Sequence, residues 1–538
     1  MNAAERAIIL FGSILAFGAA TLGCPVVYTP GPPAANSGRP RLPGVATGVV
    51  AARPAAPSAP GTVDCTHRGS GKDYAVGPGK EYASIGAVPF EKLESGDTVR
   101  IFWRKEHYRE KMMIGGVGNV AQPVRVCGVP GPHGELPVID GENATTRREL
   151  DFPYDGHQPR GLVIIGHRHD EPYERTPSHI VLEGLEVRNG SPPFSFTDKF
   201  GKVTPYSTIA AGIFVERAAH LTIRGCVVTE NNNGIFIGTG GGVGLTEDVL
   251  LERNHIHHNG SLAEYYEHNV YNEVSGVTYQ FNRFGPPRGG KNGPLGANIK
   301  ERSAGVVIRY NWIEDGAHVL DIVDAQEAMA STVRMPSFHA TFVYGNVILR
   351  GRASGSMIHY GGDSGEFKNY RKGTLHFYNN TVVVKNDDYA DYQSAAVFEL
   401  STQDEHLEAK NNVFWSTVTP TALRPVGLLG SRDQVTSGVA RLSRNWLATG
   451  WTPLDLTPGA TVAVKAEITG VEGSVRGASP GFVDAHADDY RLAPASALRG
   501  GGQALGQDDL PLAFQYIRHQ NGAPRRDGAK PTLGALAD

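Results

Sequence analysis

The sequence predicts an all-β protein that folds as a right-handed, single-stranded parallel β-helix. A short motif, in which an alternating apolar run is followed by Gly or Asn and a second apolar run, recurs nine times between Gly184 and Asn445. The repeated Gly and Asn positions are 28 to 41 residues apart, and a period in this range indicates stacked supersecondary units. The runs are too short and too rich in β-branched residues for helix pairs, so their alternation favours strands.

One Gly or Asn per repeat is expected at the same turn of every coil. Asn tolerates the left-handed backbone conformation, and its amide can hydrogen-bond to its copy in the next coil. A single coil cannot bury its apolar face, whereas stacked coils share one core. We therefore expect about ten or more coils with these residues aligned. The positions are Gly184, Gly225, Asn254, Asn282, Asn311, Asn346, Asn380, Asn412 and Asn445.

The first 24 residues have the pattern of a targeting segment. Arg6 precedes the apolar run AIILFGSILAFGAATLG, which ends at Cys24 and whose length and small residues suit a secretory signal better than a membrane span. The tetrapeptide TLGC resembles a bacterial lipobox, which predicts cleavage and lipidation of Cys24. Ordinary secretory cleavage and a retained anchor are the alternatives. Residues 25–60 are rich in Pro, Ala, Gly and Ser and are expected to form an extended tether. The protein would then be secreted or held at the cell surface or in the periplasm by a lipid anchor in the membrane.

The net charge and the number of cysteines limit the classes of binding partner and the number of disulfides. The net charge is −4, so no basic field indicates nucleic acid, and we expect a monomer. If Cys24 is acylated, three cysteines remain and allow at most one disulfide. Cys65 and Cys127 flank the first folded segment, so their pairing is plausible in an oxidising compartment. Cys226, beside a repeat Gly, is expected to be a small buried apolar residue.

Residues 61–180 resemble the N-terminal cap and first coils of pectate-lyase-like β-helices. The resemblance rests on YAVGPGKEYASIGAVPFEKLESGDTVRIFW, MMIGGVGNVAQPVRVCGVPG and LPVIDGENA. It implies a short amphipathic helix over about Tyr82–Leu93 that covers the open end of the stack, where apolar core and strand edges would otherwise be exposed. Residues 181–450 would form the central coils and 451–538 the last coils and a C-terminal cap.

The central segments EHNVYNE (267–273), ANIKERS (297–303), IRYNWIEDG and FVYGNVI resemble a group of secreted bacterial β-helix proteins described as polysaccharide-degrading. In that group we expect His-Asn-x-Tyr followed by Gly-His-x-x-Lys-Ser-Arg. Here Gly296 is present, but Ala297 replaces the His and Glu301 replaces the Ser. The resemblance implies a polysaccharide substrate and leaves the reaction open.

Aligning the strand of each repeat predicts a column of side chains on one outer face. Alternation places an apolar residue inward in each strand and its successor outward. Outward aromatic rings suit stacking on sugars, and the long connections 285–296 and 325–339 would form groove walls. A salt-bridged surface ladder is the alternative. The predicted column is Phe214, Phe236, Tyr271, Lys300, Asp321, His359 and Glu399; of these, Phe214, Phe236, Asp321, His359 and Glu399 are the candidate substrate-binding residues.

The groove and the implied acidic substrate together favour β-elimination at a uronate. This reaction needs a group that neutralises the carboxylate, a base for the C5 proton and a donor for the leaving oxygen. Arg302 is the candidate carboxylate clamp, Lys300 the candidate base, and Tyr271 the donor or an alternative base. His268 is a further titratable candidate. The sequence therefore predicts a polysaccharide lyase.

Several alternatives use the same face. Glu273 and Asp321 could supply oxygen ligands to Ca²⁺, although the sequence has no calcium-loop signature and does not require a cofactor. Glycoside hydrolysis needs two carboxylates, which Asp321 could provide with Glu399 or Asp324. A C5-epimerase would share the proton abstraction, and a non-catalytic surface adhesin would need only the tether and the aromatic residues.

Asn272 and Glu301 fall in the inward phase of their strands. A buried carboxylate is costly without a partner, so we expect either a bend in the strand or local pairing of the two residues. Such departures from the pattern often mark functional sites.

Overall fold

The structure, a computed structural model, describes residues 64–538 except 153, 240–245, 291–292, 352–354, 386–394, 422–424, 431–435, 455–464, 529 and 538. The chain divides into two units, Met1–Ala46 and Thr47–Asp538. The predicted signal segment, the tether and Cys24 lie outside the described residues. Within the described ranges, no helix is both long and apolar enough to cross a membrane.

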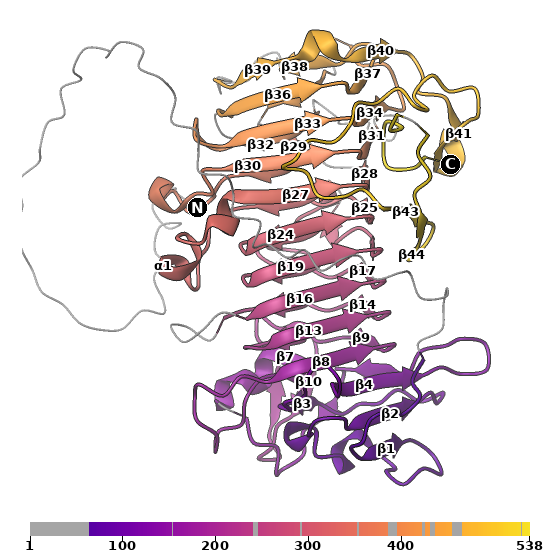
Figure 1. Cartoon of the computed structure of the whole chain (residues 1–538). Coiled ribbons are helices and arrows are strands. Elements are labelled where there is room, and N and C mark those ends of the chain that lie inside the picture. The colour runs from indigo at the N-terminus through magenta and orange to yellow at the C-terminus, as the bar shows by residue number, and fades with distance from the viewer. Residues whose placement is uncertain are drawn as a thin grey trace, which may run out of the picture. The chain divides into compact units, whose positions relative to one another are not determined.

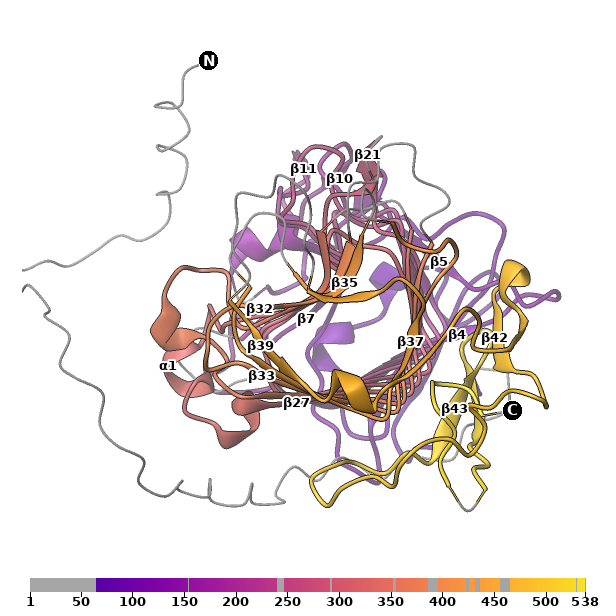
Figure 2. The ribbon, with the colours of Figure 1, turned by 90° about the horizontal axis from the view of Figure 1, so that it is seen from above.

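The second unit is a parallel β-helix built from three long sheets (Figure 1). Each full coil contributes one strand to each sheet, and the strands of successive coils lie over one another when seen along the axis (Figure 2). Strands in register with the next coil satisfy their backbone groups, while the inward side chains form one continuous core. The predicted fold, with more than ten coils, is confirmed.

The first sheet contains thirteen strands. They are β1 (Asp73–Val76), β2 (Thr98–Phe102), β4 (Val124–Val129), β8 (Ser178–Glu183), β13 (Ala219–Arg224), β16 (Glu247–Glu252), β19 (Ser275–Gln280), β24 (Ala304–Arg309), β27 (Ala340–Tyr344), β30 (Thr374–Tyr378), β33 (His406–Lys410), β36 (Val439–Ser443) and β39 (Glu467–Thr469).

The second sheet follows the first around each coil. Its strands are β5 (Val138–Asp140), β9 (Glu186–Arg188), β14 (Val227–Thr229), β17 (His255–His257), β20 (Arg283–Phe284), β25 (Trp312–Glu314), β28 (Val347–Arg350), β31 (Thr381–Val384), β34 (Val413–Ser416), β37 (Trp446–Ala448) and β40 (Val475–Gly477).

The third sheet holds the predicted column. Its strands are β3 (Met112–Ile114), β7 (Gly161–Ile165), β12 (Ala211–Val215), β15 (Asn233–Ile237), β18 (Val270–Asn272), β23 (Ile299–Glu301), β26 (Leu320–Ile322), β29 (Gly355–Tyr360), β32 (Ala395–Leu400), β35 (Val426–Leu429) and β38 (Thr452–Leu454).

Short elements lie in the connections between coils and in the N-terminal and C-terminal segments. They are β6 (Ala144–Thr145), β10 (Ser195–Thr197), β11 (Val203–Pro205), β21 (Gly289–Gly290), β22 (Gly293–Pro294), β41 (Phe482–Asp484), β42 (Asp489–Leu492), β43 (Phe514–Ile517), β44 (Asn521–Pro524), the helix α1 (Met329–Thr332) and the 3₁₀ turns η1 (Ile85–Ala87), η2 (Phe90–Lys92), η3 (Asp155–Arg160), η4 (Pro336–His339), η5 (Phe367–Asn369), η6 (Val471–Gly473) and η7 (Ala485–Ala487).

The predicted asparagine ladder is present between the first and second sheets. Asn254 donates to the Oδ1 of Asn282 both from its backbone N–H, at 2.9 Å, and from its Nδ2, at 3.1 Å. The same pair of bonds repeats coil by coil as far as Asn445. Each turn therefore satisfies its buried polar groups through the next coil.

The alignment of the two repeat glycines is wrong by one residue. Register pairs Arg224 with Glu252, which places Gly225 opposite Arg253 and Cys226 opposite Asn254. Gly184, Gly225 and Arg253 have φ values of 68°, 60° and 54°. The left-handed residue of this turn therefore precedes the ladder position, and glycine suits it because it has no Cβ.

The N-terminal end is covered by turns and not by the expected helix. The segment predicted to form a helix over about Tyr82–Leu93 consists of η1 and η2, with Ile85 and Phe90 buried over the core. Pro89 lies between the two turns and has no N–H to continue a helix. The apolar residues of this segment do cover the end of the stack, but from two 3₁₀ turns and not from an α-helix.

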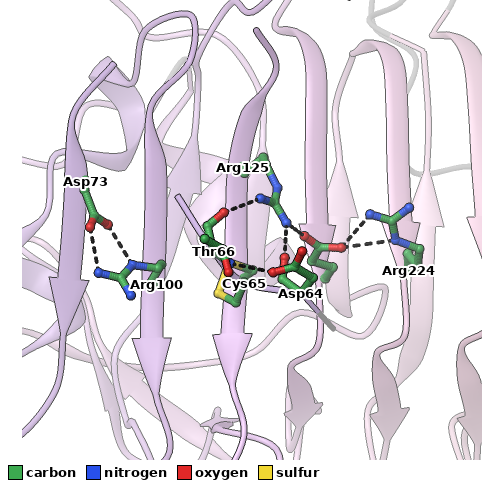
Figure 3. Close-up of a disulfide and its surroundings, with 9 residues drawn as sticks. Asp64, Cys65, Thr66, Asp73, Arg100, Arg125 and Arg224 are labelled. Atoms are coloured by element: carbon green, nitrogen blue, oxygen red, sulfur yellow. Dashed lines mark hydrogen bonds and ion pairs between the residues drawn. A yellow bond between two sulfur atoms is a disulfide. The ribbon is translucent and has the colours of Figure 1, made fainter. Parts of the chain in front are cut away.

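A disulfide holds the first described residues against the coils. Cys65 and Cys127 are bonded, with their Cα atoms 5.7 Å apart, which is the predicted pairing. Arg125 lies beside this disulfide and donates to the carbonyl of Thr66 at 2.9 Å (Figure 3). Cys226 is buried and free, as expected, and its backbone N–H donates to Asn254 Oδ1 at 3.0 Å.

The C-terminal segment runs back along the outside of the coils beyond β40, as the yellow strands in Figure 1 show. The hydroxyl of Tyr378 donates to the carbonyl of Leu510 at 2.8 Å, and Gln520 Nε2 donates to the carbonyl of Arg253 at 2.9 Å. The segment covers outward aromatic side chains of the first sheet. Burial of these aromatic side chains explains why the last residues turn away from the helix axis and run along the outside of the coils.

Candidate functional site

The predicted column exists on the outer face of the third sheet. Strand register pairs Phe214 with Phe236. Each later coil adds one more residue to the same column. The residues that precede the column members in sequence belong to the main core, so the column side chains point away from it. In order, the paired residues are Phe214, Phe236, Tyr271, Lys300, Asp321, His359 and Glu399.

Most of this column is buried, so the expectation of an exposed face is wrong. Lys300 and Asp321 are each 6% exposed and His359 is 3% exposed. Residues 323–339 and 361–371 cover them. The fully buried Arg371 holds this cover in place by donating to the carbonyls of Val323 at 3.0 Å and Ser303 at 2.9 Å.

Glu273 also fastens the cover. Its carboxylate accepts the backbone N–H groups of Gln326, Glu327 and Ala328 at 2.8, 2.7 and 2.7 Å. Both of its oxygens are used in this way. Among the described residues, the group of candidate metal ligands around Asp321 consists of His318 and His359 and does not include Glu273.

Lys300 and Arg302 belong to an ion-pair network. The Lys300 ammonium contacts both Asp321, at 2.5 Å, and Asp363. Arg302 contacts Asp363 at 3.1 Å and donates to the carbonyl of Asp324 at 2.6 Å. Burial opposes ionisation, but Lys300 and Arg302 lower the pKa of Asp363 to about 2. Because the Lys300 ammonium donates to two carboxylates, this geometry does not favour Lys300 as a catalytic base.

Tyr271 remains in a position to donate a proton. Its ring stacks on that of Phe236, with centroids 4.5 Å apart, and the Arg302 guanidinium lies 5.8 Å from its centroid. Burial raises the pKa of Tyr271 despite Arg302, so its hydroxyl stays protonated. His268 is buried and accepts the N–H of Ala297 at 2.9 Å. Burial lowers the pKa of His268 to about 3, so its imidazole is neutral.

The last column residues form a buried polar group. Glu399 accepts a hydrogen bond from Ser356 Oγ at 2.6 Å. His318, Asp321 and His359 offer ligand atoms that all lie within 4.8 Å of one another. Two imidazoles and one carboxylate suit a transition metal better than Ca²⁺, which takes six to eight oxygen ligands. These residues could hold such an ion, but the set differs from the expected one.

An open pocket of about 290 Å³ lies at the aromatic end of the column. Phe214 and Phe236 line it, as expected for substrate-binding residues, together with Arg160, Glu216 and Glu327. The Arg160 guanidinium lies 4.5 Å from the Phe214 centroid and 5.2 Å from that of Phe236. His157, Tyr173, Gly238 and Thr239 complete the lining.

Two carboxyl groups of this pocket have strongly perturbed acidity. Burial raises the pKa of Glu216 to about 7, and burial together with Glu273 raises the pKa of Glu327 to about 7. A carboxyl group with such a pKa exchanges protons readily at neutral pH. Arg160 Nε is buried without a hydrogen-bond partner among the described residues, which leaves it available to a ligand, whereas Glu216 Oε2 lies 3.3 Å from His167 Nδ1.

Sequence reasoning missed Arg160, Glu327 and Asp363, which lie in connections outside the aligned strands. Glu327 falls within the predicted wall 325–339, and that wall does reach the pocket. The other predicted wall, 285–296, lines a different depression of about 640 Å³ with Glu230 and Glu314.

No protein-family model and no curated protein matches this chain. Among solved structures, pectate lyase Pel9A is similar at 12% identity, with 88% of this chain and 99% of that chain covered and a TM-score of 0.43. An alginate lyase from Paenibacillus sp. str. FPU-7 is similar at 11% identity over 71% and 93% of the two chains, with a TM-score of 0.29. A DFA-IIIase from Arthrobacter chlorophenolicus A6 is similar at 14% identity over 71% and 88%, with a TM-score of 0.33. These similarities are too distant to indicate an activity, and the three long parallel sheets themselves identify the fold of this chain as a right-handed parallel β-helix.

Proposed function

We propose that this protein is a carbohydrate-active enzyme that binds an acidic polysaccharide in the Arg160 pocket and cleaves it by β-elimination. The observation that carries the proposal is the combination in one open pocket of two aromatic rings, Arg160 and two carboxyl groups with pKa values near 7. Aromatic faces suit the apolar faces of sugars. A volume of about 290 Å³ is at the lower end of ligand pockets, which fits one sugar residue of a chain.

Arg160 is assigned to the uronate carboxylate. Its planar guanidinium can donate two parallel hydrogen bonds to a carboxylate, and it already lies over Phe214 and Phe236. Neutralising the carboxylate makes the adjacent C5 proton more acidic. This assignment replaces Arg302, whose guanidinium is already engaged by Asp363.

Glu327 is assigned as the base and Tyr271 as the proton donor. The Glu327 Oε2 accepts the N–H of Thr239 at 3.1 Å, which fixes the carboxylate in the pocket wall. In the reaction, Glu327 takes the C5 proton, the C4–O bond breaks as the C4=C5 bond forms, and Tyr271 protonates the leaving oxygen. Lys300 and Arg302 act by holding the charged cover beside Tyr271.

Glycoside hydrolysis is the second candidate, because Glu216 and Glu327 line the same pocket. A carboxyl pair can serve as general acid and as base or nucleophile. This pair differs from the Asp321 pairs expected from the sequence, which are buried. A C5-epimerase would use the same proton abstraction and return the proton to the opposite face.

The discriminating experiment is incubation with a panel of uronans, with and without added divalent cations. Elimination creates a conjugated alkene with new ultraviolet absorbance, and Glu327→Gln should remove it. Glu366→Gln, an exposed glutamate of the cover, is the matched control. New reducing ends without that absorbance would favour hydrolysis, incorporation of solvent deuterium at C5 without cleavage would favour epimerisation, and binding alone would favour an adhesin.

The cellular location is also proposed to be extracellular, with Cys24 lipidated. The Cys65–Cys127 disulfide supports an oxidising compartment. Expression of the full chain in a bacterial host with a labelled fatty acid should label the wild-type protein and leave Cys24→Ser unlabelled. Equal labelling of both proteins would contradict this assignment.

A further inference from the structure

Ser401, His359 and Asp321 form a continuous chain of hydrogen bonds on the third sheet. His359 Nε2 lies 2.9 Å from Ser401 Oγ, and His359 Nδ1 lies 3.0 Å from Asp321 Oδ1. A hydroxyl, an imidazole and a carboxylate in this order are the parts of an activated serine nucleophile, which is recognised by geometry and not by sequence position.

Stacking of three successive coils creates this arrangement. Asp321 belongs to β26 and His359 to β29, and these two residues are direct register partners. Ser401 follows β32, the next strand of the sheet. Because neighbouring strands lie about 4.8 Å apart, each side chain can reach the next coil but not the one beyond it.

The surroundings of Asp321 orient the imidazole. Lys300 contacts Asp321 Oδ2, which leaves Oδ1 to accept the Nδ1–H of His359. Burial opposes ionisation, but Lys300 and the hydrogen bond from His359 hold the pKa of Asp321 well below its usual range. An ionised carboxylate at Nδ1 places the lone pair of the neutral imidazole on Nε2, facing Ser401.

Two glycines bring the backbone close to the serine. A Cβ on Gly361 would clash with Ser401 Oγ, and one on Gly362 would clash with the ring of Tyr370. The N–H of Gly362 points at Ser401 Oγ, at 3.0 Å. Ser401 Oγ also lies 3.1 Å from the carbonyl oxygen of Gly362, so the backbone of this glycine positions the hydroxyl group beside His359. Ser401 is partly exposed, whereas His359 and Asp321 are buried.

We propose that Ser401, His359 and Asp321 constitute a second catalytic centre that hydrolyses carboxylic esters. Ser401 Oγ forms a bond to the ester carbonyl carbon while His359 Nε2 takes the hydroxyl proton. The carbon–alkoxy bond then breaks, and His359 returns the proton to the leaving alkoxide. Water, deprotonated by His359, attacks the acyl-serine, which releases the carboxylic acid and regenerates Ser401.

The acid–base chemistry of this centre differs from that of the Arg160 pocket, so the proposal stands without the elimination reaction. One part rests on the proposed function: on an acidic polysaccharide, the natural substrate class is an ester-linked acyl group on a sugar hydroxyl. The two activities are separable because Ser401→Ala should leave elimination of an unesterified uronan unchanged.

The first experiment uses the full chain with p-nitrophenyl acetate and with a fluorophosphonate reagent. The wild-type protein should release p-nitrophenol, and mass spectrometry should find the phosphonate on the Ser401 peptide. His359→Gln should lower the rate at least about 100-fold, the lower bound of what a general base contributes. The matched control is Ser364→Ala, an exposed serine of the same cover, which should retain the rate and the label.

The opposing interpretation is that Ser401 only anchors residues 360–362. Wild-type protein that neither hydrolyses the ester faster than Ser401→Ala nor takes up the reagent at Ser401 would overturn the proposal, and the labelling result stands even if that variant fails to fold.

Discussion

Tyr279 donates its hydroxyl hydrogen to the carboxyl group of Glu301 inside the β-helix, directly behind the charged face. Asn272 Nδ2 donates to the same hydroxyl at 2.6 Å, and the N–H of Ser303 donates to Glu301 at 2.8 Å. The two inward polar residues therefore meet through Tyr279 without a bend in the strand. Burial raises the pKa of Glu301, so the core favours its neutral form.

Replacing Tyr279 with Phe should lower the free energy of unfolding by about 1–3 kcal/mol, because Asn272 Nδ2 and Glu301 Oε2 each lose the hydrogen bond to the Tyr279 hydroxyl. Urea unfolding monitored by circular dichroism measures this change. Tyr265→Phe, at an exposed position, should be neutral. Equal stability of the two variants would show that the core cluster contributes nothing.

Substitutions in the middle of the asparagine ladder should destabilise the fold more than a substitution at its last described step. Asn311 both donates to Asn346 and accepts from Asn282, whereas Asn445, at the last described step, accepts from Asn412 and donates to the carbonyl of Ala409. Asn311→Ala should cost about 3 kcal/mol or more, since several buried groups lose partners at about 1–3 kcal/mol each. Thermal unfolding should show a smaller loss for Asn445→Ala, and the reverse order would contradict this account.

Lys111 should destabilise the fold at neutral pH. It is buried, donates to the carbonyl of Gly161 and lies 4.1 Å from the Phe196 ring centroid, and burial holds its pKa well below the usual value. The unfolded chain then binds more protons, so stability rises with pH until the unfolded lysine deprotonates near pH ~10.4.

At pH 7, the free energy of unfolding of Lys111→Met should therefore exceed that of the wild type by about 1–3 kcal/mol. Denaturant unfolding should show this difference as a higher midpoint. This advantage should shrink as the pH approaches 10. Lys368→Met, at an exposed lysine, should show no such trend. A constant advantage at all pH values would show that the effect is packing and not ionisation.

Asp363 should reduce the long-range attraction of Lys300 and Arg302 for an anionic chain bound in the Arg160 pocket. Its carboxylate neutralises both cations, so Asp363→Asn should tighten binding of a uronate oligosaccharide, by about tenfold if about 1.4 kcal/mol of attraction is released. Isothermal titration calorimetry at low and moderate salt measures this effect, which should weaken as salt rises. Asp404→Asn, at an exposed aspartate paired with Lys372, serves as the control, and an unchanged affinity in Asp363→Asn would remove Asp363 from this role.

The pH dependence should identify the role of Glu327. As a base it must be ionised, and its pKa is about 7, so the elimination rate should rise through neutral pH and then level off while Tyr271 stays protonated. A hydrolase that uses Glu216 as acid and Glu327 as base would show a bell-shaped profile instead. A rate that is independent of pH between 5 and 9 would exclude both carboxyl groups.

By itself, the sequence determined the β-helix, the asparagine ladder, the order of the column and the Cys65–Cys127 pairing. These features depend on alternation and on a repeat length, which can be counted along the chain. The ladder register was wrong at Gly184 and Gly225, because a turn that needs a left-handed residue accepts glycine one position before the asparagine.

The tertiary structure alone decided which part of the column is open. Periodicity assigns a side chain to a face but does not show what covers that face, and the covers around Arg371 and Asp363 come from connections without a repeat. For this reason Lys300 became part of a buried ion-pair network, while Arg160 and Glu327, far apart in sequence, joined Phe214 and Phe236 in a pocket. The spacing of coils likewise brought Ser401 to His359, a contact across a sequence separation of 42 residues that no local motif encodes.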